Sequence, residues 1–207
     1  MSDQAEFWNT RFAKDGFMYG EKPNEFIKNN THLFTPKADI LCLAEGEGRN
    51  AIYLAKQGFA VTALDTSDIG LAKCALNAAR SGLDVSLSCT DLEQWDASTT
   101  YDAIVASFMH LPEPLRTKTF KTAMDALRPE GYIVMEFFSK DQMRQGFPSG
   151  GPKDLDLLYS VEEVALVVTT PKTKVLHLEQ EEDTLDEGWG HQGKASLIRL
   201  ILQKKAD

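Results

Sequence analysis

The sequence predicts a single α/β domain built on a doubly wound, mostly parallel sheet with helices on both faces. Apolar runs typical of strands alternate with amphipathic segments typical of helices along most of the chain. The last two strand-like segments follow one another without a helix between them. The alternation indicates βαβ units, and the late pair indicates an antiparallel hairpin at the end of a three-layer α/β/α domain.

The individual elements follow from spacing and from glycine or proline breaks. The strand-like segments are residues 38–44, 59–64, 85–89, 101–108 and 132–138. The helical segments between them are residues 49–57, 66–81 and 112–128, and two short helices are expected at 3–14 and 24–30. Residues 161–168 fit a helix or a strand, because their β-branched side chains suit both patterns. Residues 174–180 and 195–202 alternate and are expected to form the terminal hairpin.

Composition narrows the classes of function. The chain has 207 residues, 43% of them hydrophobic and 26% charged, which is typical of one globular domain. Its net charge of -9 argues against nucleic acid as the main partner, since an acidic surface repels phosphates. No apolar run approaches a membrane span, and the first residues are not a signal peptide. We expect a cytoplasmic protein, a monomer or homodimer with a small-molecule substrate and without a metal.

A glycine-bearing turn after the first strand is the main candidate for a ligand site. Gly46 and Gly48 lie between a strand and a helix, where glycines let a ligand approach the backbone. Asp65 ends the second strand about 20 residues later, where a carboxylate accepts hydrogen bonds from ribose hydroxyls, although a helix-capping role competes for this region. Asp91 follows the third strand, with Leu92 beside it to pack on a base. Together these features predict a nucleoside ligand at the carboxyl ends of the strands.

Charge at the turn distinguishes two nucleoside cofactors. A dinucleotide site usually has a glycine at the position of Ala44 and room for a pyrophosphate. Glu45 and Glu47 flank the turn, and two carboxylates repel a pyrophosphate but attract the ammonium and sulfonium of S-adenosylmethionine. We therefore rank S-adenosylmethionine above NAD.

The same residues resemble a known family. Residues 41–51 and 61–65 are similar to motifs one and two of class I S-adenosylmethionine-dependent methyltransferases. Residues 7–12, 19–24, 150–158, 185–188 and 191–195 extend the resemblance to the subgroup of tellurite-resistance and thiopurine methyltransferases. The resemblance implies a Rossmann-like, seven-stranded sheet with an antiparallel strand seven, Asp65 on the ribose and Asp91 near the adenine. Two departures are Cys42, where an acidic residue is common, and Ala44, where the first glycine is common; Glu45 is a substitute contact for the methionine amine.

These considerations give the expected cofactor contacts. They are Arg11, Tyr19, Ala44, Glu45, Gly46, Glu47, Gly48, Asn50, Asp65, Thr66, Asp91, Leu92 and Ser107. Arg11 is the candidate partner of the cofactor carboxylate.

The acceptor side is less defined by the sequence. His110 is a candidate general base beyond the fourth strand, although a hydrogen-bonding role in its loop is favoured; the other histidines receive no catalytic role. Residues 139–160 are a candidate lid, and residues 1–30 form a helical, aromatic cap, although core packing explains its aromatic residues equally well. The lid and substrate candidates are Trp8, Gly150, Gly151, Pro152, Asp154 and Tyr159.

The expected activity is methyl transfer to a small acceptor, including a soft nucleophile such as a thiol or a selenium or tellurium oxyanion. For such acceptors, positioning supplies much of the rate enhancement. A module that binds S-adenosylmethionine without chemistry and an NAD-dependent oxidoreductase are the alternatives.

Overall fold

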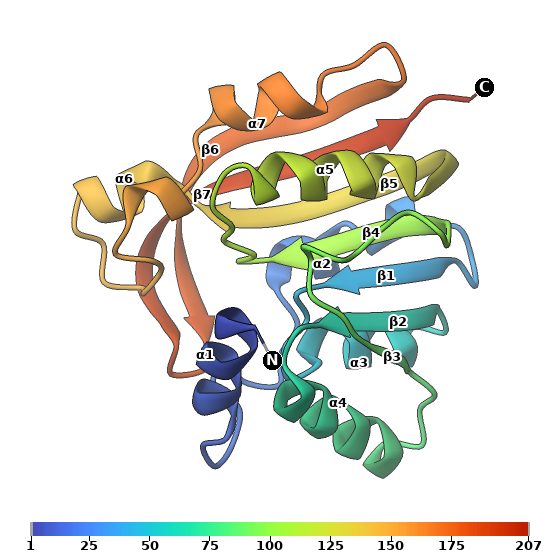
Figure 1. Ribbon diagram of the computed structural model, residues 1–207, viewed down its shortest axis with the longest axis vertical. Coiled ribbons are helices and arrows are strands. Elements are labelled where there is room, and N and C mark those ends of the chain that lie inside the picture. Colours follow the sequence, from blue (N-terminus) through green and yellow to red (C-terminus); the bar gives the residue numbers. More distant parts are fainter. Residues whose placement is uncertain (1, 207) are drawn as a thin grey trace.

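The computed structural model describes residues 2–206 and contains a seven-stranded sheet in the order β3-β2-β1-β4-β5-β7-β6 (Figure 1). The strands are β1 (Asp39–Leu43), β2 (Ala60–Asp65), β3 (Ser86–Cys89), β4 (Tyr101–Ser107), β5 (Leu127–Phe138), β6 (Thr173–Glu187) and β7 (His191–Lys204). The first five strands pair in parallel, whereas β7 pairs antiparallel with both β5 and β6. The predicted mostly parallel sheet with a terminal antiparallel hairpin is confirmed.

Helices cover both faces of this sheet and make the three predicted layers. The helices are α1 (Asp3–Phe12), α2 (Glu25–Asn29), α3 (Arg49–Lys56), α4 (Asp68–Arg80), α5 (Leu115–Asp125), α6 (Lys140–Arg144) and α7 (Val161–Val168), with 3-10 turns η1 (Thr31–Leu33) and η2 (Leu155–Leu157). Apolar side chains of α5 and α7 pack on one face, and those of α2, α3 and α4 pack on the other. None of the helices within residues 2–206 is both long and apolar enough to cross a bilayer.

Three segments show where the structure refines the sequence-based expectation. Helix α5 ends at Asp125 rather than at residue 128, because β5 already begins at Leu127. Residues 161–168 form a helix, since Ser160 and Glu163 make a reciprocal capping box at its start. The candidate lid, 139–160, is partly ordered into α6 and η2.

The terminal hairpin is much longer than its alternating segments suggested. Its strands pair from Thr173 opposite Lys204 to Glu187 opposite His191. Phe138, the last residue of β5, pairs with Leu197, so the hairpin continues six residues of β7 past the carboxyl end of β5. The hairpin tip therefore stands beside the edge of the sheet where ligands bind in this architecture.

Candidate functional site

The glycine turn lies at the carboxyl end of β1, as predicted. Gly46 and Gly48 have φ values of 59° and 92°, and Ala44, although not a glycine, has a φ of 49°. A Cβ added at Gly48 would lie 2.3 Å from the Sγ atom of Cys74 in α4. Gly48 is thus required both for its backbone conformation and for the close contact between the turn and α4.

Asp65 ends β2 beside this turn, because β1 and β2 are in parallel register up to Leu43 and Leu64. Its Oδ2 accepts a hydrogen bond from the Gly46 amide at 2.8 Å, and its Oδ1 accepts one from the Ser67 amide at 2.7 Å. Burial raises the pKa of this carboxyl, and the two amides partly oppose that shift. The side chain is 6% exposed, and each oxygen retains a lone pair for a further donor.

Glu45 points into the protein rather than away from it. Its Oε1 accepts a hydrogen bond of 2.7 Å from the Ala51 amide, and its Oε2 lies 3.4 Å from the Asn50 side-chain nitrogen. Burial raises the pKa of Glu45 to about 7, against the opposing effects of the Ala51 amide and of Arg49. The carboxyl group therefore caps the first turn of α3.

Glu47 is also occupied by protein groups. Lys73 lies 2.7 Å from its Oε1, and the Met18 amide donates to its Oε2 at 2.7 Å. The expectation that Glu45 and Glu47 present two free carboxylates to a cationic ligand is not supported by these contacts. The charge argument against a pyrophosphate is correspondingly weaker, and the case for the cofactor depends on the turn and on Asp65.

The segment after β3 places Asp91 and Leu92 next to Asp65. The Thr90 amide donates to the Asp65 carbonyl at 2.9 Å, which joins the ends of β2 and β3. Asp91 is half-buried and accepts from the Glu93 amide at 3.0 Å, while Leu92 is buried in the core. Thr66 follows Asp65 and is half-buried. Their predicted contacts to an adenine stay predictions.

Helix α1 packs over the glycine turn. Phe12 is buried, and its ring would lie 2.9 Å from a Cβ at either Gly46 or Gly70. Trp8 stacks on Phe12 with 5.4 Å between ring centroids. The Arg11 guanidinium lies over the Phe7 ring at 3.6 Å, so the contacts give no support to a carboxylate-binding role for Arg11. The aromatic segment thus covers the turn with its own packed cluster.

A second group of residues lies on the β4 side of the turn. Ser107 ends β4, and its Oγ accepts a hydrogen bond of 3.1 Å from Asn50. Arg49 begins α3 and forms a buried ion pair of 2.8 Å with Glu187 at the end of β6. Its guanidinium also lies 3.4 Å from the Tyr19 carbonyl oxygen. Arg49 therefore links the turn, the N-terminal segment and the hairpin tip.

Three residues predicted on the acceptor side have mainly structural contacts. His110 Nδ1 lies 2.9 Å from the Leu157 carbonyl, and the Phe138 amide lies 3.4 Å from Nε2. Burial lowers the pKa of His110 to about 3, and backbone groups engage both of its ring nitrogens, so no lone pair is left for a substrate proton. Tyr159 is fully buried and donates to the Met109 carbonyl at 2.8 Å, so it does not face a pocket. Asp154 is exposed and caps η2 through the Asp156 amide.

The glycines of the candidate lid pack on aromatic rings. A Cβ added at Gly150 would lie 2.6 Å from the Gly190 carbonyl oxygen and 3.3 Å from Cδ2 of His191. A Cβ added at Gly151 would lie 2.9 Å from the Phe138 ring. Pro152, the next residue, is half-buried. This part of the predicted lid therefore contacts the hairpin tip, although its movement stays a prediction.

His191, for which no role was predicted, lies in this group. Its ring centroid is 4.4 Å from that of Tyr19, 4.2 Å from that of Phe108 and 5.0 Å from that of Phe138. These residues come from four distant parts of the chain. Two signals were available in the sequence. One was the resemblance of residues 191–195 to the methyltransferase subgroup, and the other was the glycine-rich run from Gly188 to Gly193 around a histidine, which has no spacing typical of a known site.

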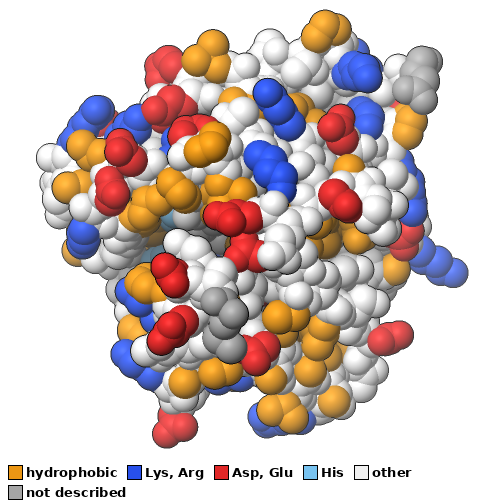
Figure 2. Space-filling model, viewed as in Figure 1, with side chains coloured by type: hydrophobic (Ala, Val, Ile, Leu, Met, Phe, Trp, Pro, Cys, Tyr) orange, Lys and Arg blue, Asp and Glu red, His pale blue; other side chains and the backbone are white. Residues whose placement is uncertain are grey.

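The surface is hollowed between α1 and α6, in front of the β6–β7 hairpin, and histidine and hydrophobic side chains border the hollow (Figure 2).

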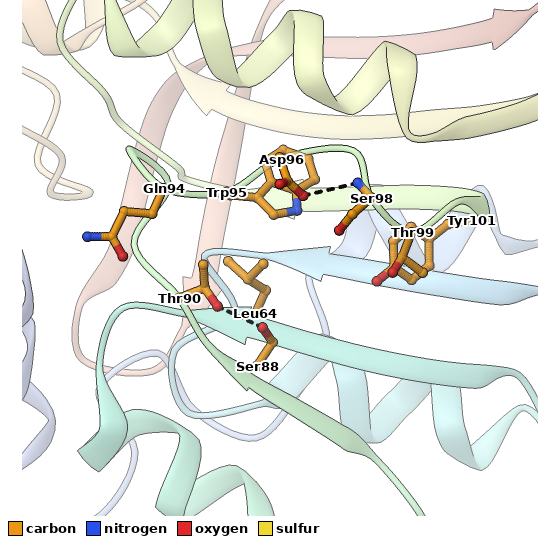
Figure 3. A pocket seen from close by; sticks show the side chains of 9 residues that line it. All are labelled: Leu64, Ser88, Thr90, Gln94, Trp95, Asp96, Ser98, Thr99 and Tyr101. Atoms are coloured by element: carbon orange, nitrogen blue, oxygen red, sulfur yellow. Dashed lines mark hydrogen bonds between the residues drawn. The ribbon is translucent and has the colours of Figure 1, made fainter.

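A separate pocket of about 200 Å³ lies on the sheet under the segment after β3 (Figure 3). It is lined by Leu64, Ser88, Thr90, Gln94, Trp95, Asp96, Ser98, Thr99 and Tyr101. None of the glycine-turn residues lines this pocket, although Leu64 and Thr90 are neighbours of Asp65 and Asp91.

Comparison with known proteins identifies relatives of the central region. Residues 40–131 match a family described as a methyltransferase domain. A putative methyltransferase of Bacillus subtilis, YqeM, is 30% identical over 127 residues, which are 58% of this chain and 50% of YqeM. The chain therefore spans about half the length of this curated relative.

Solved structures share the fold over nearly the whole chain. TehB from Haemophilus influenzae superposes with a TM-score of 0.71 at 19% identity, covering 98% of this chain and 67% of TehB. The N-methyltransferase NodS from Bradyrhizobium japonicum, solved with S-adenosylhomocysteine, gives 0.72 at 14% identity, covering 98% and 99%. At these identities the likeness shows the seven-stranded methyltransferase fold.

Proposed function

We propose that the chain is an S-adenosylmethionine-dependent methyltransferase that acts on a small molecule. The observation that carries this proposal is the position of the glycine turn and Asp65, side by side at the carboxyl edge of the sheet. Both lie within the 92 residues, 40–131, that match a methyltransferase domain. The relative YqeM, a putative methyltransferase, supports methyl transfer, and the S-adenosylhomocysteine complex of NodS supports S-adenosylmethionine as the donor.

The residues at this edge fit the donor chemically. Gly46 and Gly48 let Phe12 and Cys74 pack closely on the turn, whose backbone is the proposed surface for the ligand, and Asp65 has acceptor capacity for ribose hydroxyls. Leu92, which is buried beside Asp91, is the predicted apolar contact to a base, and Ser107 with Asn50 offers polar contacts at the end of β4. The bound donor supplies an activated methyl group, and the protein supplies orientation and exclusion of water.

The proposed acceptor is a small molecule, and we also propose its chemical class. The sequence resemblance favours a soft nucleophile such as a thiol or a selenium or tellurium oxyanion. The acidic net charge of -9 disfavours nucleic acid, and the hollow beside the hairpin is the proposed place for the acceptor (Figure 2).

Calorimetry tests the donor. We expect saturable binding of S-adenosylhomocysteine and none of NAD; NAD binding without S-adenosylhomocysteine binding would instead favour an oxidoreductase. A panel of thiols, phenols, selenite and tellurite, scored by release of S-adenosylhomocysteine from S-adenosylmethionine, then tests chemistry. Donor binding without turnover on any panel member would favour a binding module over an enzyme.

A further inference from the structure

The tip of the β6–β7 hairpin is fixed against the N-terminal segment. The Gly190 amide donates to the Met18 carbonyl at 3.0 Å. A Cβ at Gly188 would lie 2.4 Å from the Gly20 nitrogen, so only glycine permits this approach. The contact holds the two residues that flank the tip, Glu187 and His191, over the carboxyl edge of the sheet.

These two residues and Arg49 form a buried chain of polar groups. Glu187 is 6% exposed and His191 is 4% exposed. Arg49 lies 2.8 Å from Oε2 of Glu187, which keeps the carboxylate charged and in place. The same Oε2 faces Nδ1 of His191 at 3.7 Å, and within residues 2–206 no hydrogen bond reaches that nitrogen. A buried ring nitrogen without a hydrogen bond is uncommon in folded proteins, and at this position it indicates a functional group.

The ring of His191 lies among aromatic side chains and faces the candidate lid. Tyr19, Phe108 and Phe138 surround its ring. Its Cδ2, which is bonded to Nε2, faces Gly150 of the candidate lid. None of the hydrogen bonds described for residues 2–206 uses Nε2. Histidine side chains are visible in the hollow that Figure 2 shows in front of this hairpin.

We infer that His191 is the proton acceptor of the methyl-transfer reaction and that Glu187 is its positioning residue. The inference rests on the proposed function. A carboxylate facing Nδ1 favours the tautomer that carries its proton there, which leaves the Nε2 lone pair for the acceptor. The aromatic surroundings point to a planar or apolar acceptor that carries a hydroxyl, thiol or amine proton.

The proton balance explains why such an acceptor needs this residue. A lone pair of the acceptor heteroatom forms the bond to the methyl carbon, and the carbon–sulfur bond breaks with its electron pair going to sulfur. The proton of the acceptor goes to Nε2 of His191 and then to water. Tellurite and selenite, which present oxyanion lone pairs, do not need this step.

Burial is the main influence on the protonation of His191, and it favours the neutral ring before the reaction. Burial lowers its pKa, Glu187 opposes that shift, and Arg49 adds to it. Burial also acts against the charge of Glu187, but His191 and Arg49 outweigh burial and lower the pKa of this carboxyl. The titratable and charged groups that face or influence His191 are Tyr19, Arg49, His110 and Glu187.

Nitrogen-15 NMR of the protein saturated with S-adenosylhomocysteine tests the tautomer and the contact without turnover. The His191 signals are assigned by their loss in His191→Gln. We expect the proton on Nδ1, and a change of the Nε2 shift when phenol or thiophenol is added but not when tellurite is added. A proton on Nε2, or no response to phenol and thiophenol while S-adenosylhomocysteine is bound, would overturn the role of His191 and leave the proposed function intact.

Steady-state turnover provides a second test, with phenol or thiophenol as the acceptor, whichever changes the Nε2 shift. His191→Gln should lower kcat about 100-fold or more and abolish the rise of kcat with pH, because the proton acceptor is lost. Glu187→Gln should lower kcat less than His191→Gln does and should change the tautomer ratio of His191. His32→Gln, at an exposed position, is the matched control and should leave kcat unchanged. Calorimetric binding of S-adenosylhomocysteine to each variant confirms folding; failure of the wild-type protein to bind it would remove the proposed function and this inference together.

Discussion

The two sides of the candidate site use buried carboxylates differently. On the glycine-turn side, Glu45 and Asp65 accept hydrogen bonds from backbone amides, and Glu47 pairs with Lys73. On the hairpin side, Glu187 pairs with Arg49 and faces a histidine whose buried Nδ1 has no hydrogen-bond partner within residues 2–206.

This difference indicates which side holds a fixed ligand-binding backbone and which side holds groups that can take part in the reaction. Carboxylates that hold amides fix the path of a backbone, so the turn presents a preformed surface to a ligand. Polar atoms that the fold leaves unused are available for a reacting group. The glycine-turn side is therefore expected to respond to mutation through stability and donor binding, and the hairpin side through turnover.

The largest expected effect is on the shape of the turn. Gly48→Ala places a Cβ 2.3 Å from Cys74 Sγ at a φ of 92°, so we expect a loss of about 4 kcal/mol in the free energy of unfolding. Urea denaturation measures it. Gly82→Ala is the control, because Gly82 has a positive φ but no atom within 4 Å of the added Cβ, and it should cost only about 1 kcal/mol. Equal losses in the two variants would contradict the close-packing role.

A smaller effect is expected from the buried charge of Glu45. Its pKa of about 7 in the folded protein lies above the ordinary value of 4.5, so the folded state binds more protons between these pH values. The contribution of Glu45 to stability is therefore complete below about pH 4.5 and is lost as pH rises through 7.

Glu45→Gln removes this titration. Relative to the variant, the wild-type protein should lose up to about 3 kcal/mol of unfolding free energy between pH 4.5 and pH 8, at about 1.4 kcal/mol per pKa unit. Urea denaturation across that pH range measures the difference. A constant difference between the two proteins would show that Glu45 is not a buried, titrating group.

The smallest of these effects concerns donor binding. Asp65→Ala should weaken S-adenosylhomocysteine binding by about 1–3 kcal/mol, because it removes a charged acceptor and frees two backbone amides of the turn. Calorimetry at matched salt measures the change, with exposed Asp84→Ala as the control. Unchanged affinity in Asp65→Ala would contradict the ribose assignment.

The turn was predictable from sequence because its parts are close in the chain or separated by one regular unit. Gly46, Gly48 and Asp65 belong to a single β–α–β segment, in which strand ends meet by geometry alone. The fold followed from the same alternation of strands and helices. The partners of Glu47 were not predictable, since Lys73 reaches it from another helix and Met18 from the N-terminal segment.

The group of residues beside the β6–β7 hairpin could not be predicted from local sequence patterns. Tyr19, Arg49, Phe108, Phe138 and His191 meet only because β7 continues past the end of β5, and the alternating pattern that predicted residues 195–202 stops before that extension. His110 was a candidate general base because it follows β4, but its ring nitrogens face Leu157 and Phe138. Local pattern alone does not distinguish these two histidines.

A crystal structure of the protein with S-adenosylhomocysteine tests the central claim most directly. We predict electron density for the ligand along the glycine turn, with a ribose hydroxyl within hydrogen-bond distance of the Asp65 carboxylate and the sulfur facing the hollow beside His191. Density for the ligand only in the separate pocket near Trp95, or a glycine turn without ligand at saturating concentration, would contradict it.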